Sequence, residues 1–308
     1  MKIQFGAPGC VVGLVLVGAL GMTSASSAAG RQSTPPPLKH APVQLHRNPD
    51  GSPQRGLRNQ FISTNWSGYV VANYQTGVKY TSASMSWVVP AVSYGQSTDT
   101  TSSTQYSANW VGIGGFCANL LCTRGDHTLI QLGTEQDVSP SGATNYYAWY
   151  EVLPQAGTPL NPTSFPVHPG DLVTASLSCQ QPCSGKKQNW TLSMTDETRN
   201  WTWKMQLSYG SSLLSAEWIE EAPFSGGILP LADFGTAQFP GSNLANTTSP
   251  KVSSANAIQM QDPWAIALTP RLRRYPISMS AGTLRGFVSR RGPSLNADEP
   301  AIASEISG

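Results

Sequence analysis

The segment Ser215–Pro223 concentrates acidic side chains in a chain that has few of them. It places Glu217, Glu220 and Glu221 within five positions, although only 12% of the 308 residues are charged. The aromatic and β-branched residues between them favour a β-strand, in which side chains alternate faces, so Glu220 shares a face with Trp218. A carboxyl beside apolar rings loses solvation, which raises its pKa and suits a general acid or base. The alternative is an edge strand whose carboxylates are simply solvated.

Two other segments carry polar side chains among apolar ones. Gln131 lies between Ile130 and Leu132, and Glu151 follows Trp149 with the Trp-x-Glu spacing of the first segment. If these faces converge, the chain has a groove lined by Trp, Gln and Glu. The alternative is that the tryptophans, including Trp110, are core residues and that Glu151 is a charge at the rim.

The sequence argues against several other chemistries. Within the body of the chain, residues 59–290, only His127 and His168 could serve as a histidine base, and both lie in turn-like sequence. No Gly-x-Ser-x-Gly motif, Asp-Thr-Gly loop, phosphate-binding glycine loop or metal-type histidine cluster is present. The formal net charge of +2 gives no strong field for nucleic acid. We therefore expect carboxylate and amide chemistry, with no cofactor, no metal and no nucleic-acid partner.

The segments that must position these residues have the composition of β-strands. Short aromatic and β-branched segments alternate with turns rich in the 29 Gly and 24 Pro, and no helical period is evident. This pattern predicts an all-β sandwich or barrel over residues 59–290, with a last strand pair between Ile277 and Val288. The clearest predicted strands are 65–71, 85–90, 108–115, 128–133, 146–154, 172–177, 190–194 and 200–205.

Both ends of the chain differ from this body. Residues 1–29 have the pattern of a secretory signal, with Lys2 before an apolar run and small residues for cleavage. Residues 30–58 are rich in Pro and basic residues, which favours an extended pro-segment or linker that buries no core. Residues 291–308 are expected to be a loose tail. We expect a secreted, extracellular monomer with no membrane contact after signal removal.

Four cysteines remain after the leader, as the close pairs Cys117 with Cys122 and Cys179 with Cys183. Outside the cell two local disulfides are the leading interpretation, and a zinc site is the rival.

Six motifs in order make the chain resemble the glutamic peptidases, also called eqolisins or the G1/A4 peptidases. They are Asn65-Trp66-Ser67-Gly68, Trp110-Val111-Gly112-Ile113, Leu129-Ile130-Gln131, Ala148-Trp149-Tyr150-Glu151, Pro169-Gly170-Asp171 and the Ala-Glu-Trp-Ile-x-Glu pattern that begins at Ala216. The resemblance implies a concanavalin- or jelly-roll-like β-sandwich of two large antiparallel sheets. It also implies a secreted, acid-active endopeptidase, made with a signal and a pro-segment, that acts on polypeptides.

The resemblance assigns roles to particular residues. By motif match the catalytic glutamine falls on Gln131 and the catalytic glutamate on Glu220. Glu220 would take a proton from a shared water and later return it to the leaving amine, while the Gln131 amide would stabilise the oxyanion. Trp110, Trp149, Glu151 and Glu135 are assigned to substrate binding by the same match; Glu135 replaces an aspartate.

Besides Glu135, two positions depart from the family pattern, and two other functions stay open. Gly114 stands where fungal members carry an acidic residue, and Leu153 where they tend to have an aromatic. A glycoside hydrolase that uses Glu151 and Glu220 is the alternative enzyme. A carbohydrate-binding sandwich with a Trp-lined groove is the alternative without catalysis.

Overall fold

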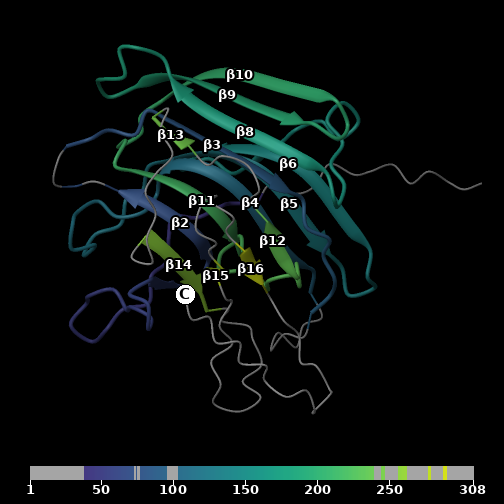
Figure 1. Ribbon diagram of the computed structural model, residues 1–308, viewed down its shortest axis with the longest axis horizontal. Helices are drawn as coiled ribbons and strands as arrows, with labels where there is room; N and C mark the ends of the chain where they lie inside the picture. Colours follow the sequence, from purple (N-terminus) through teal and green to yellow (C-terminus); the bar gives the residue numbers. More distant parts are fainter. Residues whose placement is uncertain are drawn as a thin grey trace, which may run out of the picture. The chain divides into compact units, whose positions relative to one another are not determined.

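The structure is a computed structural model that describes residues 38–72, 74, 77–95, 103–238, 244–246, 256–261, 277–278 and 287–289. The regular elements in these ranges are β-strands (Figure 1). The predicted signal at 1–29 and the predicted tail at 291–308 lie outside these ranges. The chain divides into the units Met1–Ser33 and Thr34–Gly308, and all described residues belong to the second.

The first sheet has eight strands and contains every segment singled out above for chemistry. Its spatial order is β1-β14-β2-β11-β4-β5-β6-β7, antiparallel except for the parallel pair of β1 and β14. The strands are β1 (Phe61–Ser63), β2 (Trp66–Ala72), β4 (Gln105–Gly114), β5 (Leu129–Val138), β6 (Thr144–Val152), β7 (Thr158–Pro159), β11 (Ser215–Glu221) and β14 (Ala257–Met260).

The second sheet runs β10-β9-β8-β3-β12-β16-β15, and β13 also pairs with β3. Its strands are β3 (Ser82–Val88), β8 (Leu172–Cys179), β9 (Gln188–Asp196), β10 (Trp201–Tyr209), β12 (Thr236–Gln238), β13 (Leu244–Ala245), β15 (Ile277–Ser278) and β16 (Phe287–Ser289). β15 and β16 are the predicted last strand pair. The all-β prediction is therefore confirmed, with two sheets as expected of a sandwich.

The main core lies between the two sheets. Along β8 and β9 buried and less buried residues alternate, because one face of an antiparallel sheet packs inward while the other meets water. The core joins Trp87, Val173 and Leu192 of the second sheet to Val111 and Trp218 of the first. We call the surface of the first sheet that faces this core its inner face.

The outer face of the first sheet is also covered, which explains why every residue of β5 and β11 is buried. A second apolar cluster includes Trp66, Trp110 and Trp149, with Val43 and Leu45 packed against it. The cover therefore includes residues 38–46, which we call the N-terminal segment. Pro-rich composition predicted an extended segment that buries no core, yet Leu38, His40 and Ala41 are buried here.

Both predicted disulfides are present, Cys117–Cys122 and Cys179–Cys183, in place of the rival zinc site. Among the described residues, no helix has the length and hydrophobicity needed to cross a membrane.

Candidate active site

The strand register decides which side chains share the outer face of the first sheet. Residues directly opposite each other on paired antiparallel strands point to the same side. Three successive rows across β11, β4, β5 and β6 face outward: Glu217, Gly112, Gln131 and Glu151; Ile219, Trp110, Gly133 and Trp149; Glu221, Ala108, Glu135 and Tyr147. Five residues of the predicted site, Gln131, Trp110, Trp149, Glu151 and Glu135, are thus on one face.

No side chain extends from the outer face at Gly112 and Gly133, which lie beside Gln131 and Trp110. A Cβ at Gly133 would lie 2.1 Å from the carbonyl oxygen of Asn109, and a Cβ at Gly112 would lie 3.2 Å from Cβ of Gln131. The Gln131 side chain therefore stands next to a position without a side chain on β4.

Glu220 lies on the inner face, so the prediction that it faces Gln131 is wrong. Its partners across the sheet are Asn109 and Thr134, in a row that alternates with the outward rows. The Asn109 amide donates a hydrogen bond to Glu220, and Trp218 shares the same face. The predicted link between apolar burial and a raised pKa does hold, because burial raises the pKa of Glu220 well above its usual value. The alternative pairing of Glu151 with Glu220 fails for the same reason.

The acidic residue that does share the face of Gln131 is Glu221. The Ala-Glu-Trp-Ile-x-Glu pattern leaves one residue between the isoleucine and the last glutamate. Counted from Ala216, that intervening residue is Glu220 and the glutamate is Glu221. Register and motif therefore agree on Glu221, and the assignment to Glu220 was displaced by one residue.

Glu221 is held in place by its neighbours on the outer face. The indole Nε1 of Trp110 donates to Oε2 of Glu221 at 2.7 Å. Burial raises the pKa of Glu221 well above its usual value; the charge of Glu151 adds to the rise, and the Trp110 hydrogen bond opposes it. While the outer face is covered, burial therefore favours the protonated form of Glu221.

Gln131 and Glu151 form the second half of the site. The Gln131 amide nitrogen, Nε2, donates to Oε2 of Glu151 at 2.9 Å and to the backbone carbonyl oxygen of His40 at 3.0 Å. Burial raises the pKa of Glu151 to about 8, although hydrogen bonds from His40 and Gln131 act against the rise. The amide proton of Gln131 is thus directed at a peptide carbonyl, as an oxyanion donor requires.

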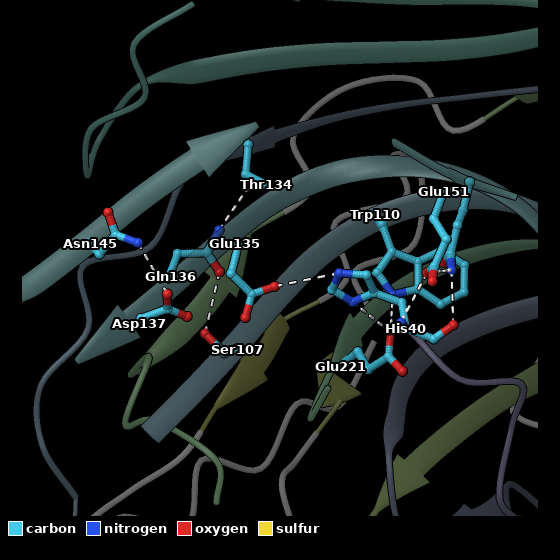
Figure 2. A network of polar contacts seen from close by, with 11 residues as sticks. His40, Ser107, Trp110, Thr134, Glu135, Gln136, Asp137, Asn145, Glu151 and Glu221 are labelled. Atoms are coloured by element: carbon cyan, nitrogen blue, oxygen red, sulfur yellow. Dashed lines mark hydrogen bonds and ion pairs between the residues drawn. The ribbon is translucent and has the colours of Figure 1, made fainter. Parts of the chain in front are cut away.

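His40 connects the two halves of the site. Its imidazole stacks on Trp149 with 3.5 Å between ring centroids and 7° between planes. Nδ1 lies 3.3 Å from Oε2 of Glu221 and Nε2 lies 3.6 Å from Oε2 of Glu135. Figure 2 shows the ring between these two carboxyls. Burial lowers the pKa of His40 well below its usual value, which favours the neutral imidazole.

A second polar group extends along β5 from Glu135. Burial raises the pKa of Glu135 well above its usual value, and the charge of Asp137 adds to the rise. Asp137 accepts a hydrogen bond from Asn145 at 3.2 Å (Figure 2). Among the described residues, no cluster of three or more His, Cys, Asp or Glu is arranged to hold a metal ion.

Sequence reasoning missed Glu221 and His40 as members of this site. A correct count along the motif would have found Glu221, since alternation already placed it on the face opposite Trp218. His40 carried no signal, because its contacts are with residues about a hundred positions away in the chain.

The comparisons with known proteins agree with this architecture. Residues 64–269 match the Peptidase A4 family. Two solved structures match over 74% of this chain and 98% of theirs, each at 20% sequence identity. They are scytalido-glutamic peptidase with a transition-state analogue inhibitor, with a TM-score of 0.51, and the same enzyme with a peptide-based analogue, with a TM-score of 0.48. No curated protein matches.

The family match covers two thirds of the chain and spans every strand from β2 to β14, including the outward rows of β4, β5, β6 and β11. The chain therefore belongs to the Peptidase A4 family, the glutamic peptidases.

Proposed function

We propose that this protein is a secreted, acid-active endopeptidase that hydrolyses polypeptides with Gln131 and Glu221. The observation that carries the proposal is the hydrogen bond from Gln131 to a backbone carbonyl, on a residue whose ring faces Glu221. An amide donor on a peptide carbonyl and a carboxyl beside the same residue are the two groups that acid-base hydrolysis of an amide needs.

The chemistry proceeds through water and one carboxyl. Glu221, as carboxylate, removes a proton from a water that attacks the carbonyl carbon. The negative charge that develops on the carbonyl oxygen is stabilised by the amide proton of Gln131. Glu221, now protonated, gives the proton to the leaving nitrogen as the C–N bond breaks.

The proposed acid range follows from the cover over the site. With the N-terminal segment in place, burial raises the pKa of Glu221 and favours its protonated form. When the cover leaves, water reaches the carboxyl and its pKa falls towards the ordinary value of about 4.5. Both protonation states are then populated in acid, as a group that cycles between base and acid requires.

Secretion is supported by the leader-like residues 1–29 and by two disulfides, which persist in oxidising compartments. The N-terminal segment has the place and the contacts of a pro-segment, since it covers the face that carries Gln131 and Glu221.

The test is digestion of a denatured protein in acid, with and without pepstatin. We expect cleavage that resists pepstatin, because no aspartic dyad is involved. Gln131→Ala should lower kcat/KM about 100- to 1000-fold, the usual effect of removing an oxyanion donor. Gln206→Ala is the matched control, since Gln206 is exposed on β10 of the other sheet. Full activity in Gln131→Ala would refute the proposal.

A further inference from the structure

The N-terminal segment crosses the outer face as an extended peptide whose backbone is bound on both sides of His40. On the side before His40, the Gly157 N–H donates to the carbonyl of Leu38 at 2.8 Å. Lys39 and Phe224 exchange a pair of backbone hydrogen bonds of 3.2 and 2.8 Å. Backbone pairing of this kind holds an extended peptide without regard to its side chains.

The residues after His40 are held by the side chains of Trp66 on β2 and of Asn65, which precedes it. The Trp66 indole donates to the carbonyl of Ala41 at 3.1 Å, and the Asn65 amide donates to the carbonyl of Pro42 at 3.2 Å. The Asn65 side-chain oxygen in turn accepts from the Gln44 N–H at 2.8 Å. The peptide unit between His40 and Ala41 is therefore fixed from both directions.

That peptide unit occupies the place where the proposed chemistry happens. Its carbonyl oxygen accepts from Gln131, and the His40 N–H donates to Oε2 of Glu151 at 2.9 Å. Glu221 lies 3.3 Å from the ring of the same residue. His40 is only 1% exposed, so the whole residue is seated in the site.

His46 is the other histidine of the N-terminal segment, and its backbone is bound differently from that of His40. It lies six residues further along the same segment, yet its carbonyl accepts from the backbone N–H of Gln54 at 2.8 Å, and its own N–H donates to Ile62. The carbonyl of His46 is engaged by local backbone rather than by Gln131.

We infer that the His40–Ala41 bond is bound as a substrate and is the bond that this enzyme hydrolyses in its own chain. The inference rests on the proposed function. One water is consumed: its oxygen joins the carbonyl carbon of His40, the C–N bond breaks, and the proton goes to the nitrogen of Ala41. The products are a peptide that ends in the carboxyl of His40 and a chain that begins at Ala41.

The same contacts describe what the site selects. The ring of the residue before the cleaved bond stacks on Trp149 and lies between the carboxyls of Glu135 and Glu221. Loss of that ring removes an aromatic stack, so His40→Ala should slow the cut about tenfold. His46→Ala is the matched control and should leave its rate unchanged.

The experiment starts from the full chain purified at neutral pH and shifted to a pH of about 4. Intact mass and N-terminal sequencing follow the chain, while a denatured protein in the same sample reports digestion in trans. We expect a new N-terminus at Ala41, absent in Glu221→Gln. The first-order rate should not change on tenfold dilution, because the bond is already seated in its own site.

Other outcomes overturn the inference in distinguishable ways. Digestion of the added protein without an N-terminus at Ala41, or with cleavage after His46 instead, refutes self-cleavage at this bond and leaves the proposed function standing. A cut at Ala41 that slows in proportion to dilution refutes cleavage within one molecule. If neither the added protein nor the chain itself is cut, the proposed function fails as well.

Discussion

Glu220 and Glu221 offer a test in which two adjacent carboxyls of one strand should behave oppositely. The changes are Glu221→Gln and Glu220→Gln, each of which keeps the shape of the side chain and removes its ability to ionise. In Glu221→Gln the amide oxygen can still accept from the Trp110 indole, which donates to Glu221 at 2.7 Å. The fold should therefore remain, and the loss should be one of chemistry.

The expected sizes differ because the two environments differ. Loss of a general acid-base group typically costs about 100- to 10,000-fold in rate, so Glu221→Gln should fall into that range. Glu220 is already neutral because burial raises its pKa, and a glutamine oxygen can keep the hydrogen bond from Asn109. Glu220→Gln should therefore change stability by no more than one hydrogen bond, roughly 0.5–1.5 kcal/mol, and activity by less than about fivefold.

The assay is kcat/KM on a fluorogenic peptide at a pH of about 4, with urea unfolding of each variant to confirm the fold. The reasoning requires activity in Glu220→Gln and its loss in Glu221→Gln. The reverse pattern would show that the register of β11 or the assignment of its outward face is wrong. Loss in both variants with normal unfolding curves would place a chemical role on each face of the sheet.

Three further predictions follow from the packing. Burial raises the pKa of four carboxyls, Glu135, Glu217, Glu220 and Glu221, and it raises the pKa of Glu151 to about 8. Above a pH of about 4.5 the folded protein therefore binds more protons than the unfolded chain. Stability is then greatest below that pH and falls as the pH rises, so the urea midpoint should be lower at pH 8 than at pH 4; an unchanged midpoint would contradict the buried carboxyls. Gly133→Ala should lower the melting temperature or prevent folding, because the new Cβ meets backbone, whereas Gly125→Ala, with open space around it, should melt like the parent. Asn65→Ala removes hydrogen bonds to the N-terminal segment, so hydrogen exchange over residues 41–44 should quicken while that of β9 stays constant; equal protection would show that Asn65 does not hold the segment.

The fold could be predicted from the sequence because aromatic and β-branched strand segments, and the Gly and Pro of the turns, can be recognised from neighbouring residues alone. Alternation along 147–153 and around Gln131 also placed the Trp, Gln and Glu side chains correctly on one face. The error at Glu220 has a simple physical form. A strand has a period of two, so a displacement by one residue moves a side chain from one face to the other. The spacing of three glutamates within five positions does not reveal such a displacement, whereas a correct count along the Ala-Glu-Trp-Ile-x-Glu pattern and the register across β4 and β5 both do.

His40 was out of reach for a different reason. Its segment is rich in Pro and basic residues, a composition that predicts an exposed and extended chain. The segment is extended, yet the apolar rings of β2, β4 and β6 supply a surface that can bury it. Local composition cannot report such a partner, because the favourable free energy belongs to a contact between distant parts of the chain.

The way residues 38–44 lie across the sheet also provides an outline for an inhibitor. A short compound could copy the hydrogen bonds to Gly157 and Trp66, place a flat ring over Trp149, and replace the His40 carbonyl with a group that water cannot hydrolyse. Its affinity would come from contacts that the protein already makes with itself. Such a compound would compete with the chain's own N-terminus and would bind only after that cover has gone.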